Sequence, residues 1–176
     1  LWGITEADVA LTDYLLFAQG LLLAWWIWRQ APLSQIARLF VLFFLGVSLA
    51  SFLGGTAHGF FYNSNGFGAK LLWAMTLVSI AGICWVIWLL IAAITFNQAK
   101  RQLFWLGTAQ FIIFLITIST ITQDFVVVIV NYFPLVIFLL IAMLWRWHRQ
   151  GEPQLWWGVA ALSITLGAAV IQQLGI

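Results

Sequence analysis

The chain has 176 residues, of which 64% are hydrophobic and only 7% are charged, and its net charge is +2. Soluble domains carry about 25% charged residues, so this composition excludes an ordinary water-soluble protein. The small net charge is spread over short loops and gives no sign of nucleic-acid binding. The single cysteine, Cys84, excludes an internal disulfide and a metal site built from several cysteines.

Six apolar stretches follow one another along the chain, each close to the ~20 residues that a helix needs to cross a bilayer. Their continuous apolar character favours helices over a membrane β-barrel, whose strands alternate apolar and polar residues. Short connections containing Pro, Asn and Gly separate them, so we expect a single transmembrane domain over residues 1–176. The sequence therefore predicts an all-α integral membrane protein, a bundle of about six helices with short loops, at about 9–28, 36–61, 69–96, 103–120, 125–145 and 155–174.

The basic residues predict how these spans are oriented. All but Lys70 fall in or beside the first, third and fifth connections: Arg29, Arg38, Lys100, Arg101, Arg146 and Arg149. The positive-inside rule places these connections in the cytoplasm and the N-terminus outside, in a bacterial inner membrane or a thylakoid-type membrane. Most tryptophans map to the same inner ends, among them Trp25, Trp88 and Trp145, as expected of an interfacial girdle.

The second span carries the richest run of polar and small residues. His58 lies near its outer end, and Ser51 stands two turns earlier on the same helix face. Small residues favour close packing of this span against another helix. A histidine framed in this way either hydrogen-bonds to a neighbouring helix or binds a metal, a haem or a pigment. The small residues concerned are Gly46, Ala50, Gly54 and Gly55.

Several other polar residues are predicted to share the outer face with His58: Glu6, Asp8, Asp13, Asp124, Gln172 and Gln173. Polar loops alone explain Asp124, but Asp13 and His58 lie about one turn within their spans, where polar groups are costly. We therefore expect His58 to face the bundle interior. Because a ligand-binding imidazole commonly donates its second ring N–H to a carboxylate, we expect Asp13 as its nearest acidic neighbour.

Two polar residues lie deeper in the predicted bundle. Gln110 is expected to form hydrogen bonds between helices. Asn131 comes just before Pro134, whose ring frees a backbone carbonyl that Asn131 or a neighbour can satisfy. Neither residue forms part of a known soluble-enzyme motif, and the chain contains no phosphate-binding loop, nucleophile elbow or His-Glu-x-x-His run.

Three short motifs stand out along the chain: Glu-Ala-Asp-Val-Ala-Leu-Thr-Asp-Tyr at 6–14, Leu-Gly-Gly-Thr-Ala-His-Gly at 53–59 and Gln-Gln-Leu-Gly-Ile at 172–176. They resemble an uncharacterised bacterial family of seven-span membrane proteins. That family is similar to the CREST superfamily of alkaline ceramidases and progestin/adiponectin-type receptors. The resemblance implies a zinc-dependent amide hydrolase within the membrane, with Glu6, Asp8 and Asp13 in its acidic cluster and His58 as a zinc ligand. It also implies a seventh helix with a His-x-x-x-His motif; residues 1–176 contain no such motif, and we expect that helix to be missing from them.

The chain departs from the superfamily pattern in two further places. Gly54 stands where the superfamily has a serine, and the third span contains no carboxylate. The leading hypothesis is therefore a CREST-like zinc-dependent lipid-amide hydrolase or a degenerate relative of one. The alternative is a non-catalytic accessory subunit of a larger respiratory or photosynthetic complex, in contact with lipids and other membrane subunits. Zinc would be the cofactor in the first case, and a pigment on His58 in the second.

The orientation generates a prediction that can be tested in intact cells. A cysteine introduced at Gln98, in a Cys84→Ser background, should resist an impermeant thiol reagent because the basic connections are expected in the cytoplasm. It should react once the membrane is permeabilised. Labelling of Gln98→Cys in intact cells would contradict the predicted orientation.

Overall fold

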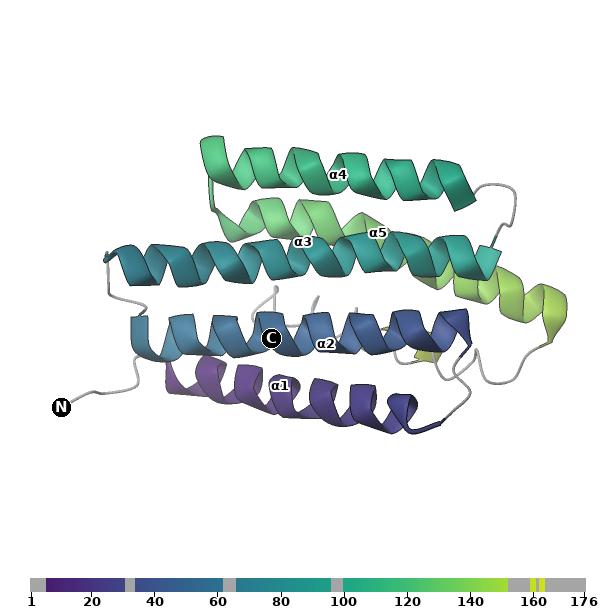
Figure 1. Ribbon diagram of the computed structural model, residues 1–176, viewed down its shortest axis with the longest axis horizontal. Coiled ribbons are helices and arrows are strands. Elements are labelled where there is room, and N and C mark those ends of the chain that lie inside the picture. The colour runs from purple at the N-terminus through teal and green to yellow at the C-terminus, as the bar shows by residue number, and fades with distance from the viewer. Residues whose placement is uncertain are drawn as a thin grey trace.

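The computed structural model describes residues 6–30, 34–61, 66–95, 100–151, 159–160 and 162–163. These residues form five helices that are long and apolar enough to cross a membrane (Figure 1). They are α1 (Ala7–Trp28), α2 (Gln35–Thr56), α3 (Phe67–Thr95), α4 (Lys100–Thr120) and α5 (Phe125–Gln150), and a π-helical turn, η1 (Ala57–Phe61), continues α2. The prediction of an all-α membrane bundle is confirmed.

The helix bounds lie close to the predicted ones. The largest difference within the described part of the chain is at the end of α5, which runs to Gln150 rather than 145. Gly151 ends this helix in a left-handed conformation, with φ of 65°, which glycine adopts without strain. The predicted sixth span, at about 155–174, lies outside the described residues except for 159–160 and 162–163.

Consecutive helices run in opposite directions, which gives the bundle two chemically different ends (Figure 1). The acidic end, where α1 and α3 begin, carries Glu6, Asp8, Asp13 and Asp124 together with Lys70. The basic end, where α2 and α4 begin, carries Arg29, Arg38, Lys100, Arg101, Arg146 and Arg149. The structure thus gathers the charges as the sequence predicted, while the side of the membrane that each end faces stays a prediction.

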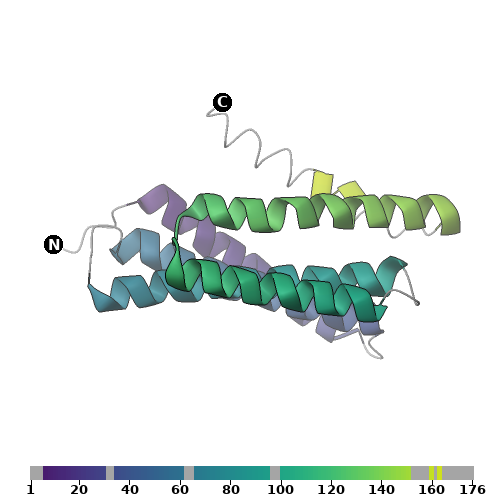
Figure 2. The same ribbon diagram turned by 90° about the horizontal axis from the view of Figure 1, so that it is seen from above.

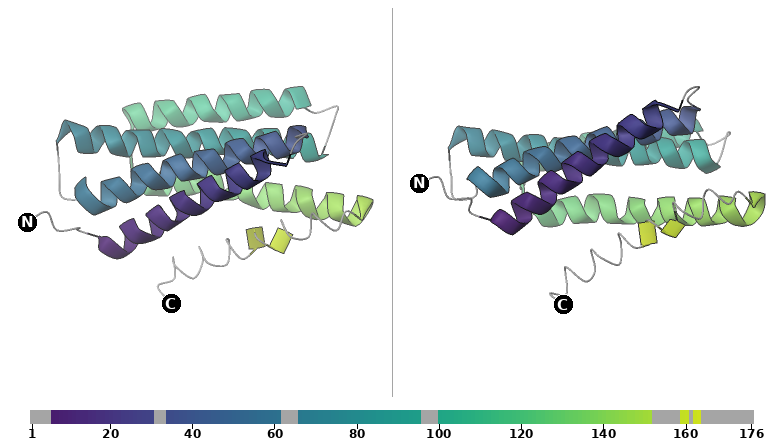
Figure 3. Two further views of the ribbon diagram at one scale, coloured as in Figure 1. Left: turned by 60° about the horizontal axis from the view of Figure 1, so that its bottom comes forward. Right: turned by 90° about the horizontal axis from the view of Figure 1, so that it is seen from below.

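Helix α3 lies at the centre of the bundle. It packs against α2, α4 and α5, and α1 packs on the far side of α2 (Figures 2 and 3). Leu77, Leu90 and Ile91 of α3 are fully buried, and α3 is the most buried of the five spans. The other helices expose large apolar side chains on their outward faces, as expected where the surroundings are lipid.

A chain of hydrogen bonds ties α3, α4 and α5 together deep in the bundle. Trp88 Nε1 donates to Gln110 Oε1 at 2.6 Å. Gln110 Nε2 in turn donates to the carbonyl oxygen of Asn131 at 2.9 Å and to its side-chain Oδ1 at 2.8 Å. Asn131 Nδ2 contacts Cys84 Sγ at 3.4 Å. The predicted interhelical role of Gln110 is confirmed.

Trp88 was expected in the interfacial girdle, and that prediction is wrong. Its side chain is only 9% exposed and belongs to the core. Gly107 on α4 makes this burial feasible, because a Cβ at Gly107 would lie 2.9 Å from three atoms of Trp88. A buried indole needs an acceptor for its N–H, and Gln110 supplies it. The exposed Trp25 and Trp145, in contrast, do lie near the basic ends of their helices.

The hydrogen-bond chain predicts that Gln110→Leu lowers stability. The substitution removes three hydrogen bonds between helices, each worth roughly 0.6 kcal/mol within membranes, so we expect a loss of about 1–2 kcal/mol. Thermal unfolding in detergent measures the effect. Ile113→Leu, at an exposed position one turn away, is the control and should unfold at the wild-type temperature. Equal unfolding temperatures for Gln110→Leu and the control would show that the network adds nothing to stability.

Candidate functional site

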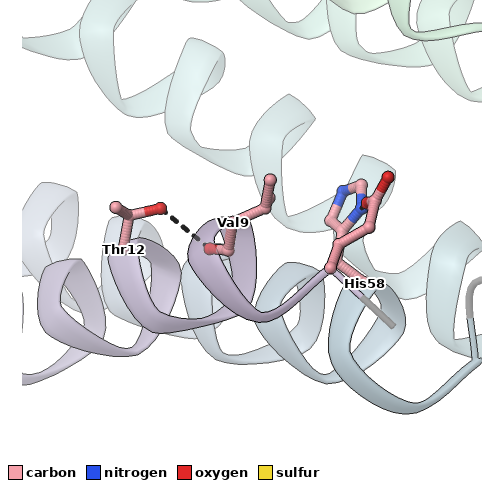
Figure 4. Close-up of polar contacts among 4 residues, drawn as sticks. Val9, Thr12 and His58 are labelled. Carbon is pink, nitrogen blue, oxygen red and sulfur yellow. Dashed lines mark hydrogen bonds and ion pairs between the residues drawn. The ribbon is translucent and has the colours of Figure 1, made fainter. Parts of the chain in front are cut away.

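His58 lies in η1, the π-helical turn that ends the second span (Figure 4). The sequence predicted an uninterrupted helix to 61, and the change from α- to π-helix was missed. Single π-helical turns are found frequently at functional sites, and they shift side chains out of the regular helical register. The local sequence Gly54-Gly55-Thr56-Ala57-His58-Gly59 contains three glycines, which was the one available signal.

The partner of His58 is Glu6, the residue that precedes α1. Nδ1 of His58 lies 2.6 Å from Oε2 of Glu6, and both side chains are 29% exposed. A residue at this position usually caps the helix through its side chain, but the Glu6 carboxylate makes no such bond and reaches across to η1 instead. Because a carboxylate accepts, Nδ1 carries the proton, and a metal would bind this imidazole through Nε2.

Asp13 was expected to be the nearest carboxylate of His58, and Glu6 takes that place instead. Asp13 still lies close enough for its charge to interact with His58. Its side chain packs over the two glycines of α2: a Cβ on Gly54 would lie 3.2 Å from Asp13 Oδ2, and one on Gly55 would lie 2.9 Å from Asp13 Cβ. The expected direction of His58, toward the bundle, agrees with its contacts to α1 and α3.

Tyr14 and Thr56 form a second contact between α1 and α2 beside this pair. The Thr56 hydroxyl donates to the carbonyl oxygen of Phe52 at 2.7 Å. Its oxygen also lies 3.0 Å from the Tyr14 hydroxyl. Since the single proton of Thr56 is already committed, Tyr14 is the donor in this second bond. Neither residue was predicted to belong to the site, although Tyr14 directly follows Asp13.

Trp73 joins the site to the connection between α4 and α5. Its ring meets the His58 ring edge to face, with centroids 6.0 Å apart. Its Nε1 donates to the carbonyl oxygen of Gln123 at 3.0 Å. The next residue, Asp124, caps α5 by accepting from the backbone N–H of Val126 at 2.9 Å. Asp124 thus lies at the acidic end as predicted, and its carboxylate serves as a helix cap.

Four of the remaining predicted residues lie on α1 and α2, at different distances from His58 along these helices. Asp8 is exposed in the first turn of α1, where a negative charge suits the helix dipole. Ser51 is half-buried two turns before His58, and Ala50 is buried. Gly46 faces α3, because a Cβ there would lie 2.9 Å from Cγ1 of Ile83. Gln172 and Gln173 lie outside the described residues.

The described residues do not by themselves form a metal centre. Within them, no group of three or more His, Cys, Asp or Glu side chains lies close enough to hold a metal ion. A catalytic zinc ion normally has three protein ligands. This part of the chain therefore offers one imidazole and its orienting carboxylate, with Asp13 nearby.

A large apolar cavity lies deeper in the bundle, away from His58. It has a volume of about 570 Å³ and is lined by α1, α2, α3 and α5, with Gln19 and Tyr132 as polar lining residues. A shallower cavity of about 400 Å³ lies between α4 and α5, beside Gln110 and Asn131. His58 lines neither of them, so these two cavities are not the polar pocket expected beside it.

The comparisons with known proteins place the chain in a family. The model of DUF6962, a family of unknown function, matches residues 9–176, and the chain belongs to this family. No curated protein and no solved structure matched it. Together with the five apolar helices, this establishes a multi-pass integral membrane protein of unknown function. None of these findings links it to the CREST superfamily.

The packing of Asp13 over the glycines generates a prediction for stability. Gly55→Ala should destabilise the protein by about 1–3 kcal/mol, the usual cost of overpacking. The added Cβ would meet Asp13 Cβ at 2.9 Å and the carbonyl oxygen of Ala10 at 3.3 Å, and neither atom can move without shifting α1.

Gly68→Ala is the matched control, because a Cβ there meets nothing within 4 Å. In the first turn of α3 it should leave stability unchanged or raise it slightly, since alanine favours helix. Thermal unfolding in detergent measures both variants. If Gly55→Ala unfolds at the same temperature as Gly68→Ala, the close contact of α1 and α2 at Asp13 is refuted.

Proposed function

We propose that this protein is a membrane-embedded hydrolase of lipid amides, related to the CREST superfamily, in which His58 is one ligand of a zinc ion. The observation that carries the proposal is the 2.6 Å contact between His58 Nδ1 and Glu6 Oε2. Histidines that bind metals almost always donate their second ring N–H to a carboxylate, a carbonyl or water. Such a partner fixes the tautomer and the direction of the ring. Residues 6–14 and 53–59 resemble an uncharacterised seven-span family that is similar to that superfamily, which agrees with this role.

The described residues do not supply enough ligands for a catalytic zinc ion. One imidazole is available from His58, and no third ligand of suitable type lies close enough in the described part of the chain. The remaining ligands of a catalytic site would have to come from residues outside it. When bound, zinc would supply an activated water with a pKa near ~7.

The chain's own residues have defined tasks in this proposal. Glu6 accepts a hydrogen bond from the Nδ1–H of His58, so a metal would bind this imidazole through Nε2. Asp13 packs over Gly54 and Gly55 of α2, and so keeps the start of α1 close to the end of α2, where Glu6 meets His58. Trp73 fixes the other side of the imidazole, since its ring meets that of His58 edge to face.

The proposal also includes the side of the membrane that the site faces. The basic end is assigned to the cytoplasm of a bacterial inner or thylakoid-type membrane, because lysine and arginine accumulate on that side. Glu6 and His58 then face outward, with the N-terminus on the same side. A lipid-amide substrate would reach them from the outer leaflet.

A second candidate function is that of a non-catalytic accessory subunit in a larger membrane complex. The incomplete ligand set in the described residues favours it. In that case the Glu6–His58 pair only fastens the start of α1 to η1. A pigment on His58 would not occupy the 570 Å³ cavity, because His58 does not line it.

Metal analysis of the protein purified from its membrane tests the proposal. We expect about one zinc per chain. His58→Gln should lose it, and Glu6→Gln should weaken zinc binding roughly 10–100-fold, the usual effect of removing an orienting partner. His148→Gln is the matched control, since His148 lies at the basic end on α5 and should keep the metal.

Two results would contradict the hydrolase proposal. One is wild-type protein without zinc, and the other is zinc retained in His58→Gln. Zinc-free protein that purifies with other membrane subunits or with a pigment would support the accessory role instead.

A further inference from the structure

The basic end of the bundle carries a concentration of charge that the candidate site does not use. It holds six of the seven basic residues of the chain. Every acidic residue that the structure describes lies at the opposite end, and Glu152 is outside the described residues. No carboxylate in the described residues therefore neutralises these cations. Their positive potential extends to whatever lies beside that end of the bundle.

Two of the six cations are held against exposed indole rings. The guanidinium of Arg29 lies over the ring of Trp25, with Cζ 4.7 Å from the ring centroid. That of Arg149 lies over Trp145 at 5.5 Å. Trp25 is 55% exposed and Trp145 is 39% exposed. Indole rings settle at the level of lipid headgroups, so both arginines are held at that depth.

Stacking also leaves these arginines suited to bind phosphate. A contact with a ring uses the flat face of the guanidinium, whereas its N–H donors point outward in the plane. Phosphate oxygens are matched to this planar fork and accept two parallel hydrogen bonds from it. The aromatic contact thus orders the side chain in advance and reduces the entropy lost on binding.

The two helices that begin at this end carry cations where they are least favourable. Arg38 lies in the first turn of α2, and Lys100 and Arg101 lie in the first turn of α4, while neither turn contains an acidic residue. The N-terminal end of a helix carries a positive partial charge, which repels these side chains. An anion placed beside them removes this repulsion.

Arg146 shows a different use of charge at the same end. Its Nη1 donates to the carbonyl oxygen of Ile94 at 3.0 Å, in the last turn of α3. A cation at a helix C-terminus satisfies one of the last carbonyls and suits the dipole. Arg146 therefore has a structural role at this end of the bundle.

We propose that the basic end binds the phosphate headgroups of anionic phospholipids, with phosphatidylglycerol as the type ligand. The cations lie at the ends of α1, α2, α4 and α5 rather than around one pocket. The two arginines with an aromatic contact are anchored beside exposed tryptophans at headgroup depth. This arrangement fits a surface of lipids around the bundle better than a single soluble anion. The proposal is independent of the hydrolase proposal and of the side that the basic end faces.

Tryptophan quenching by brominated lipids tests the proposal on the whole protein in mixed bilayers. Each cation near an anionic surface contributes roughly a fivefold preference, from ~1 kcal/mol per residue. We expect brominated phosphatidylglycerol to be preferred over brominated phosphatidylcholine by roughly fivefold or more at low salt. The preference should fall as salt rises, because exposed charges are screened.

Three variants separate this proposal from a general effect of charge. Arg29→Gln/Arg38→Gln/Lys100→Gln/Arg101→Gln/Arg149→Gln removes every cation of the proposed surface and should bring the preference close to one. The charge-conserving Arg29→Lys/Arg38→Lys/Lys100→Arg/Arg101→Lys/Arg149→Lys should keep the part of the preference that comes from charge, well above one, which controls for misfolding. Lys70→Gln removes a cation from the acidic end and should also keep it. Equal quenching by both lipids in the wild type, or a preference that survives in the first variant, would overturn the proposal. So would its loss on adding free glycerol 3-phosphate, since that would indicate a site for a soluble anion.

Discussion

The structure depends on one constraint, the absence of water from the hydrocarbon core of the bilayer. Every backbone N–H and C=O within that core must find a partner inside the protein, which is why the described spans are helices. The same constraint acts on side chains. Gln110 and Asn131 lie in the middle of the bundle, and they satisfy each other and Trp88 rather than face lipid. Because the three residues come from different helices, the hydrogen bonds among them also fix how α3, α4 and α5 pack.

Helix α1 is held in a different way, through close contact with α2. Small residues allow it, since Gly20 on α1 lies against the Ser48 hydroxyl and Gly55 on α2 lies against Asp13. Close contact brings the start of α1 to the end of α2, and there Glu6 meets His58 across an interval of 52 residues. The site is thus a product of helix packing. Any change that pushes α1 away from α2 separates the carboxylate from the imidazole.

The fold was predictable from sequence because it rests on composition. Runs of apolar residues of bilayer length predict where the five described spans begin and end, and the basic residues predict which helix ends lie together. Trp88 was misplaced because the rule for tryptophan describes an average preference, and a small residue at Gly107 with an acceptor at Gln110 overrides it. Such a local match between two helices is not visible in either helix alone.

The residues near His58 could be named from the sequence, but not which of them contact one another. His58 and Asp13 stand out because they are polar groups within predicted spans, and Glu6 because it precedes the first span at the same predicted membrane face. Which carboxylate meets the imidazole depends on the rotation of α1 and on the π-helical turn at His58, and each shifts a side chain by a fraction of a turn. The spacing of residues in the sequence gives the direction of a side chain around its helix only to within about a quarter of a turn. This is too coarse to choose between Glu6 and Asp13 as the partner of His58.

The separation of charge along the bundle gives the two ends different chemistry. At the acidic end, Glu6 contacts His58, and Asp8, Asp13 and Asp124 lie near the same helix ends, so that end suits cations. At the basic end, cations stand in helix first turns and over exposed indoles, so that end attracts anions. Low-dielectric surroundings let each field reach farther than it would in water. A protein with twelve charged residues among 176 can therefore still direct different ligands to its two ends, because it places almost all charges of one sign together.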